Sequence, residues 1–476
     1  MRRNIVKGGS WLALIVMTTI PVPSVASAGR GEGGQVAEQR TPPNIVLLLT
    51  DDQPEGTLRF MPNVQRLLVH QGVRFENSYV VNPVCCPSRV SNLTGGYSKT
   101  TGVYTNKANN PYGGFAAFDD DRTIATELQA AGYRTGFIGK YLNGYRNTTY
   151  VPPGWDRWFA THGAHGDSSY YDYTAISDGV EVHYGSDPSD YGQTILRREA
   201  ISFIRGTDAS QPLFMYWATP APHAPAIPQP RDRDAYASLE RWRPPSYDEA
   251  DVADKPAHVR ARPRVDGSTA REIDEFRLDQ IRSLQAADRA AAAIVETLQD
   301  TGRLQNTIIV FTSDNGMLWG EHRLFGKSEI YEESISVPLV VRYDALLDEP
   351  RRDDNLALNI DLAPTFAELA GISLPDADGR SLLPLLDSPN AGWRDSFLIE
   401  HLRAGAARMA PTFCAVHTDR FVLVRYATGE QELYDLVRDP NQMQNRDGWA
   451  AYRNRQRALR ANLRTLCDPM PPGFAF

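Results

Sequence analysis

Four short, mostly apolar runs give the clearest structural pattern in this chain. They occupy residues 44–50, 134–138, 213–218 and 307–312. Their apolar side chains follow one another without the alternation expected of a half-exposed strand, and each run is too short for an ordinary helix. Uninterrupted apolar runs of this length are typical of strands that are buried on both faces, as in a parallel sheet.

Helical patterns separate these runs, at residues 123–131 and 271–300, and a further helix is predicted at 356–370. Strands that alternate with helices indicate an α/β fold in which a mixed, mostly parallel sheet lies between helical layers. Near residue 387 the pattern changes to short strands, such as 420–426, and a helical segment follows at 449–466. We expect this last part to form a smaller, antiparallel C-terminal sheet with a closing helix.

Polar side chains follow each of the four apolar runs. Ligands bind outside the carboxyl ends of the strands in such a sheet, so these groups are expected to meet in one crevice. The acidic and amide oxygens among them suit calcium or magnesium, whereas zinc prefers nitrogen and sulfur. Taken singly, each motif is also common in turns and helix caps. The groups are Asp51 and Asp52 after the first run, Lys140 after the second, His223 after the third, and Asp314 and Asn315 after the fourth.

The N-terminal residues predict export from the cytoplasm. Three cationic side chains precede an apolar run at residues 11–20, and Ala26-Ser27-Ala28 is a suitable cleavage site, so residues 1–28 are predicted to be a signal peptide. Residues 29–41 are polar and Gly-rich, which is typical of a disordered lead-in. We expect a secreted, periplasmic or otherwise extracytoplasmic protein with no membrane span, because no later segment has the length of an apolar transmembrane helix.

Length and charge narrow the organisation and the partners. The chain of 476 residues exceeds what one hydrophobic core usually supports, which predicts a larger unit over residues 42–386 and a small α+β unit over 387–476. Removal of the signal peptide takes away three cationic side chains and lowers the net charge from −8 to −11. Such an acidic protein is a poor candidate for non-specific binding to nucleic acid.

The connection at residues 226–270 is rich in Pro, Arg and Asp. It joins His223 to the long helical segment, and we expect it either to form a rim or lid over the crevice or to be a solvated excursion. Its charged side chains are compatible with both alternatives.

The four cysteines fall into two pairs. Cys414 and Cys467 near the C-terminus are expected to be either a disulfide, in an oxidising compartment, or two buried thiols. Cys85 and Cys86 are adjacent, so they form neither a C-x-x-C redox motif nor a good disulfide with each other. They open the string Cys-Cys-Pro-Ser-Arg at residues 85–89, which Leu-Thr-Gly follows at 93–95. In isolation, this string could be two buried cysteines in a proline turn.

The C-x-P-S-R spacing resembles the signature of the sulfatase family. The resemblance implies an alkaline-phosphatase-like fold, with residues 42–386 as the catalytic domain. It also implies that Cys85 is oxidised during export, by a formylglycine-generating or equivalent maturation enzyme, to formylglycine, whose hydrate attacks sulfate esters. The expected substrate is a small-molecule or glycan sulfate ester.

The family pattern also implies roles for the strand-end residues. A divalent cation, calcium in the first place and magnesium as the alternative, would be held together with residue 85, while Arg89 would orient the modified residue. Further cationic side chains would bind the sulfate oxygens or serve the leaving group. The implied metal ligands are Asp51, Asp52, Cys85, Asp314 and Asn315, and the other implied catalytic residues are Arg89, Lys140, His223 and Lys327.

Within the family, the chain is most similar to the N-acetylglucosamine-6-sulfatases and the extracellular heparan sulfate endosulfatases. The strings that support this are Cys-Cys-Pro-Ser-Arg at 85–89, Val-Tyr-Thr-Asn at 103–106, Gly-Lys-Tyr-Leu-Asn at 139–143 and Val-Pro-Pro-Gly-Trp at 151–155. The expected activity is hydrolysis of a sulfated sugar, for example a glucosamine 6-sulfate, or of an aryl sulfate. Two alternatives stay open: a phosphomonoester or phosphonate-ester hydrolase of the same metal-dependent fold, and a glycan-binding relative that has lost catalysis.

Overall fold

The computed structural model describes residues 42–146, 148–163, 169–405 and 409–476. The predicted signal peptide (1–28) and lead-in (29–41) lie outside these residues. No helix in the described ranges is both long enough and apolar enough to span a bilayer.

A ten-stranded sheet organises most of the described chain, in the order β13-β2-β12-β9-β1-β8-β4-β5-β6-β7. Its five central strands run parallel, and the outer strands make it a mixed sheet, which confirms the predicted fold class. The central strands are β9 (Thr307–Ser313), β1 (Asn44–Thr50), β8 (Leu213–Ala218), β4 (Arg134–Lys140) and β5 (Arg157–Gly163). The outer strands are β2 (Val73–Phe75), β6 (Tyr173–Ser177), β7 (Val180–Tyr184), β12 (Leu339–Tyr343) and β13 (Arg351–Asp353).

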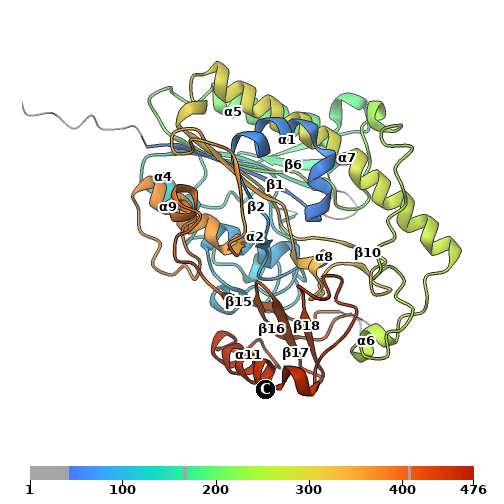
Figure 1. Ribbon diagram of the computed structural model, residues 1–476. Helices are drawn as coiled ribbons and strands as arrows, with labels where there is room; N and C mark the ends of the chain where they lie inside the picture. The colour runs from blue at the N-terminus through green and yellow to red at the C-terminus, as the bar shows by residue number, and fades with distance from the viewer. Residues whose placement is uncertain (1–41, 147, 164–168, 406–408) are drawn as a thin grey trace, which may run out of the picture. The chain divides into compact units, whose positions relative to one another are not determined.

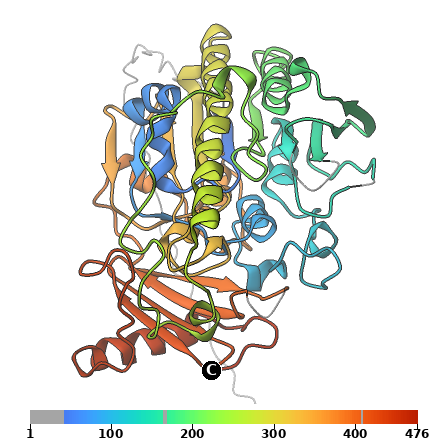
Figure 2. The same ribbon diagram turned by 90° about the vertical axis from the view of Figure 1, so that its right-hand side faces the viewer.

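Helices cover both faces of this sheet, as Figures 1 and 2 show. Successive side chains of β1 point to opposite faces, so Ile45 and Leu47 join one hydrophobic cluster while Val46 and Leu48 join another. All seven residues of β1 are buried, which explains its uninterrupted apolar sequence. One face carries α1 (Pro62–Leu67), α5 (Gly192–Arg205) and α7 (Gly267–Asp300), and the other carries α2 (Cys85–Thr94), α4 (Ile124–Ala130) and α9 (Leu362–Ala370).

The C-terminal part contains a four-stranded antiparallel sheet, as predicted. Helix α11 (Arg453–Leu466) packs on one face of it, and a disulfide between Cys414 and Cys467 links the second strand to the residue after this helix. The other face packs against side chains of the larger part, including Tyr79 and Ile335. The strands are β15 (Ser396–His401), β16 (Phe413–Thr418), β17 (Phe421–Tyr426) and β18 (Gln431–Asp435).

The predicted helix at 356–370 is only half correct. Helix α9 begins at Leu362, and the residues before it form the short strand β14 (Ala357–Leu358) and a 3-10 turn (Asn359–Asp361). β14 pairs with β3 (Ser78–Tyr79), so a tertiary contact replaces the helical hydrogen bonds that the local sequence favours.

Candidate active site

The predicted site residues come together at the carboxyl ends of the central strands. Asp51 and Asp52 follow β1, Lys140 is the last residue of β4, and Asp314 and Asn315 follow β9. The remaining residues come from loops and from one helix: Cys85 begins α2, Arg89 lies one turn further along it, His223 follows β8, and Lys327 follows β11 (Phe325–Gly326).

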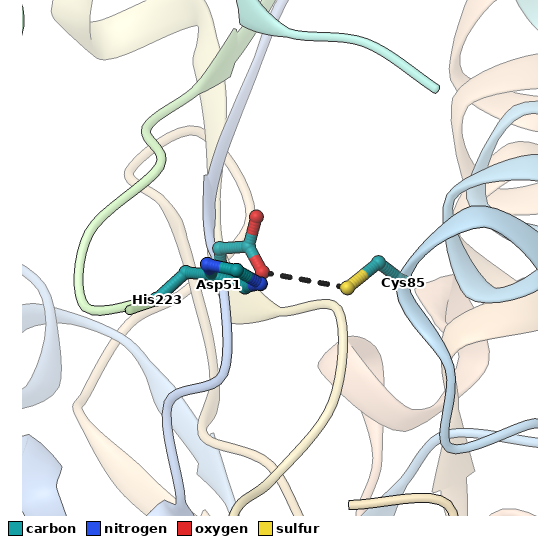
Figure 3. A group of neighbouring side chains, drawn as sticks. All are labelled: Asp51, Cys85 and His223. Carbon is teal, nitrogen blue, oxygen red and sulfur yellow. Dashed lines mark hydrogen bonds between the residues drawn. The ribbon is translucent and has the colours of Figure 1, made fainter. Parts of the chain in front are cut away.

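Cys85 is completely buried and faces charged side chains. Its Sγ lies 3.6 Å from Oδ1 of Asp51, and Nζ of Lys327 donates to Sγ across 2.6 Å. Figure 3 shows Cys85 pointing from α2 toward Asp51 and His223, which follow β1 and β8. Burial, and then the nearby charge of Asp51, raise the pKa of the Cys85 thiol, although Lys140 and Lys327 oppose this shift. The unmodified thiol is therefore a weak nucleophile at neutral pH.

Arg89 links the carboxyl ends of three strands of the central sheet. Its Nε donates to Asp314 Oδ2 (2.7 Å), its Nη2 donates to Asp51 Oδ2 (3.0 Å), and its Nη1 donates to the carbonyl oxygen of Lys140 (2.6 Å). The guanidinium is buried, so these charged contacts are formed away from solvent. Arg89 thus fixes the relative positions of β1, β4 and β9 at their functional ends.

The three carboxylates of the site are balanced by three cationic side chains. Besides Arg89, Nζ of Lys140 lies 2.5 Å from Asp51 Oδ2, and Lys327 pairs with Asp52. Burial disfavours the charged form of Asp51, but the charges of Lys140, His223 and Arg89 outweigh it and hold the pKa of Asp51 far below its usual value. Since these cationic side chains already offset the three carboxylates, a bound divalent cation would give the site a positive charge suited to an anionic substrate.

Oxygen ligands for such a cation are grouped here. Ligand atoms of Asp51, Asp52, Cys85 and Asp314 all lie within 4.8 Å of one another. The side-chain nitrogen of Asn315 donates to Asp52 Oδ1 (2.6 Å). The buried Oδ1 of Asn315 has no hydrogen-bond partner among the described residues. An unpaired buried oxygen is costly unless a cation or water satisfies it. The residues present therefore fit a calcium or magnesium ion.

His223 stands at the rim of this cluster. Its Nε2 lies 3.8 Å from Asp52 Oδ2, and its Nδ1 lies 2.7 Å from the carbonyl oxygen of Ala224. This carbonyl can only accept, so Nδ1 carries a proton and Nε2 faces the site. The turn itself is held by two hydrogen bonds, from the Tyr170 hydroxyl to the His223 carbonyl (2.8 Å) and from Gln280 Nε2 to the Pro222 carbonyl (3.1 Å).

Sequence reasoning did not find these supporting residues. Tyr170 and Gln280 lie 53 and 58 residues from the groups that they bind, outside any local motif. Asn106 belongs to one of the strings that resemble the family, and its side chain accepts from the backbone N–H of Cys86 at the start of α2 (2.8 Å). The first backbone N–H groups of a helix have no partner within the helix, and this contact supplies a partner for one of them.

Comparison with known proteins agrees with this geometry. The family model described as Sulfatase matches residues 43–372 of the chain. The chain belongs to the sulfatase family. A second model, described as the C-terminal part of N-sulphoglucosamine sulphohydrolase, matches residues 320–468. It starts within the larger predicted unit, so the boundary between residues 386 and 387 stays a prediction.

Relatives in the sulfatase family extend the comparison. The chain is 37% identical over 370 residues to the extracellular sulfatase SULF-1 homolog of Drosophila melanogaster, covering 75% of this chain but 33% of that protein. It is 33% identical over 386 residues to the human N-acetylglucosamine-6-sulfatase, covering 78% of this chain and 69% of the human one. The chain thus spans about a third of the fly protein.

A solved sulfatase-like structure matches almost the whole described fold. It has a TM-score of 0.81 and 25% sequence identity, and the match covers 91% of this chain and 99% of the other. That protein was solved in complex with its substrate, D-glucosamine-2-N,6-O-disulfate.

Replacing Arg89 should destabilise the protein strongly. In Arg89→Met, the buried carboxylates of Asp51 and Asp314 lose their shared partner, and we expect the free energy of unfolding to fall by about 3–5 kcal/mol. Urea denaturation measures this change. Arg122→Met is the control, because Arg122 forms an exposed pair with Asp376 and should leave the midpoint unchanged. Equal midpoints for both variants would contradict the bridging role of Arg89.

Proposed function

We propose that this chain hydrolyses the sulfate ester of a sulfated sugar. The observation that carries the proposal is the position of Cys85, whose Sγ lies between Asp51 and Lys327 at the edge of a candidate cation site. In this proposal Sγ stands where the oxygens of a formylglycine hydrate would lie. That group would supply a hydroxyl nucleophile for attack on sulfur, which the buried thiol cannot supply.

Conversion of Cys85 to formylglycine requires a maturation enzyme. Because Cys85 has no exposed surface in the folded chain, this enzyme would act before folding is complete. Such timing fits conversion during export. We propose accordingly that residues 1–28 are removed as a signal peptide and that the protein works outside the cytoplasm, as the name of its extracellular fly relative suggests.

The cation would be held by Asp51, Asp52, Asp314, Asn315 and residue 85. Calcium suits this set better than magnesium, because calcium accepts oxygen ligands in a less regular arrangement than the octahedron that magnesium demands. When bound, the cation would withdraw charge from the sulfate oxygens as a Lewis acid. Arg89 would hold Asp51 and Asp314 in place from behind.

The remaining side chains would bind the sulfate and handle a proton. Lys140 and Lys327 would stabilise the negative charge on the sulfate oxygens. As the ester bond breaks, negative charge also develops on the oxygen of the leaving alcohol. With both ring nitrogens protonated, His223 would donate the Nε2 proton to the oxygen of the leaving alcohol, while Nδ1 donates to the Ala224 carbonyl. Together these groups address the two obstacles to ester hydrolysis, charge repulsion and a poor leaving group.

A sugar with a 6-O-sulfate on glucosamine is the substrate that the relatives favour. The human relative is named for this specificity, and the protein with the similar solved structure has a glucosamine disulfate as its substrate. A phosphonate-ester or phosphomonoester hydrolase would use the same strand-end ligands, whereas a glycan-binding relative without catalysis would not require Cys85.

Substrate profiling tests the proposed function. The exported protein should release sulfate from glucosamine 6-sulfate with a kcat/KM at least ~100-fold above that for the matched phosphate ester, because the chain belongs to the sulfatase family and its site would discriminate between the two esters in the transition state. The panel should include 2-O- and N-sulfated sugars and an aryl sulfate. A preference for the phosphate ester would replace the proposal by the phosphohydrolase alternative, and no hydrolysis of any ester would leave the glycan-binding alternative.

Replacing Cys85 should remove activity but not the fold. Cys85→Ala is expected to reduce sulfate release by at least ~10⁴-fold, because the nucleophile is lost, with an unchanged circular dichroism spectrum. Cys86→Ala is the matched control, since Cys86 packs into the hydrophobic cluster on the α2 face of the sheet. Mass spectrometry of the exported enzyme should show formylglycine at position 85. A fully active enzyme with an unmodified Cys85 would refute the mechanism.

Removing a metal ligand should weaken cation binding. Asp51→Asn and Asp314→Asn each take one negative charge from the proposed ligand set, and we expect calcium affinity to fall by at least ~10-fold. Calorimetric titration of the EDTA-treated protein measures this affinity. Asp376→Asn, an exposed position in an ion pair with Arg122, should bind calcium like the unmodified sequence. Unchanged affinity in both site variants would rule out the ligand set.

A further inference from the structure

A cleft lined by arginines and aromatic side chains lies beside the candidate active site. It consists of an inner cavity of about 210 Å³ and an outer cavity of about 650 Å³. Arg59, Trp242 and Arg277 line both cavities and so mark the place where they meet. Arg59 belongs to the turn after the metal-site loop, Trp242 to the 226–270 connection, and Arg277 to α7, which runs beside that connection in Figure 2.

Arg277 is buried and forms no ion pair with an acidic side chain of the described residues. Its side chain is 5% exposed and lies against the rings of Trp242 and Trp319, with 5.4 and 5.3 Å from its Cζ to the ring centroids. Nη1 donates to the Glu240 carbonyl (3.2 Å), but the buried Nε has no hydrogen-bond partner. In the described chain, no carboxylate forms an ion pair with it. A buried guanidinium in this state lacks the anion that normally accompanies it.

Arg59 brings a second positive charge to the same cleft. It is exposed, lies over the ring of Phe60, and forms no ion pair among the described residues. Burial, and then the charge of Arg59, lower the pKa of Arg277, while the charges of Asp274 and Glu321 oppose this shift. The two guanidinium groups therefore repel each other across the cleft, and the nearby carboxylates offset this repulsion only in part. An anion between them would relieve this repulsion and satisfy Nε.

Acidic side chains line the inner cavity as well, but among the described residues none of them forms an ion pair with Arg59 or Arg277. Glu55 pairs with Arg74, Glu332 pairs with His417, and Glu321 accepts from the Trp319 backbone and the Trp242 indole. Burial and the charge of Glu321 raise the pKa of Glu333 to about 8, which leaves Glu333 mostly neutral at pH 7.

The cleft is connected to the turn that carries His223. Gln280, three residues after Arg277 on α7, accepts from the Trp319 indole (2.6 Å) and donates to the Pro222 carbonyl (3.1 Å). Three residues advance a helix by about 4.5 Å. Trp319 also pairs with Phe325 in the β10–β11 hairpin (Leu318–Trp319 and Phe325–Gly326), directly before Lys327. The arginine pair thus lies close to the site where the ester would be cleaved.

We propose that Arg59 and Arg277 form a second anion subsite, which binds another anionic substituent of the glycan substrate while its sulfate ester occupies the site at residue 85. This inference rests on the proposed function for the identity of the ligand. Two sources supply the required chemistry: an N-sulfate on the same glucosamine, or the carboxylate of a neighbouring uronate unit. The 226–270 connection then forms a rim of the substrate cleft, through Trp242.

Calorimetric binding to the Cys85→Ala protein tests the subsite without requiring turnover. The ligands are glucosamine 6-sulfate, glucosamine 2-N,6-O-disulfate, and glucosamine 6-sulfate linked to a uronate. Arg59→Gln should reduce the preference for a doubly anionic ligand over the monosulfate by ~10-fold, as expected for the loss of a charge-assisted contact. Arg277→Gln should do the same, and the affected ligand, disulfate or uronate, identifies the source of the anion.

Arg66→Gln is the matched control, because it removes an exposed arginine on α1 that lines neither cavity. If Arg59→Gln and the control prefer the doubly anionic ligands over the monosulfate equally, the subsite is refuted, even if Arg277→Gln fails to fold. Failure of the proposed function would be seen separately, as an absence of sulfate release by the protein that retains Cys85. A difference in binding would still support the anion subsite in that case.

Discussion

The buried contact between Arg89 and two aspartates is the constraint on which the site depends. Asp51 and Asp314 end neighbouring parallel strands, so their carboxylates are forced close together away from solvent. Arg89 neutralises both from α2, whose first residue is Cys85. The same contact therefore fixes the carboxylates of the candidate cation site and the position of Cys85. A buried charge network of this kind favours one geometry, because loss of any partner leaves an unpaired charge.

Charge also explains how the site could select its substrate. The three carboxylates are balanced by Arg89, Lys140 and Lys327, so a divalent cation would make the inner site positive. The chain as a whole is acidic, with a net charge of −8, and attraction of an anionic sugar must therefore arise locally. Arg59 and Arg277 would extend this local field from the ester to a second substituent.

Sequence patterns predicted the elements whose burial shows directly in an apolar sequence. β1 is apolar throughout because both faces of the central sheet are covered, and its predicted bounds match Asn44–Thr50. The predicted helix at 356–370 was wrong at its start, because Ala357 and Leu358 pair with a strand that lies far away in the sequence. Residues that support the site, such as Gln280, were not predicted either, since nothing in their own neighbourhood distinguishes them from other helical residues.

The sequence by itself determined which candidate reactive groups this protein carries. The motif that begins at Cys85, and the acidic side chains that end the strands, are local features, and strand polarity alone is enough to bring strand ends to one edge. The tertiary structure decided which charges meet. Arg89 contacts Asp314 across 225 residues of sequence, and Arg277 lies against one tryptophan from the 226–270 connection and another from β10. Such contacts depend on the order of strands in the sheet and on how α7 packs over it, which no short stretch of sequence encodes.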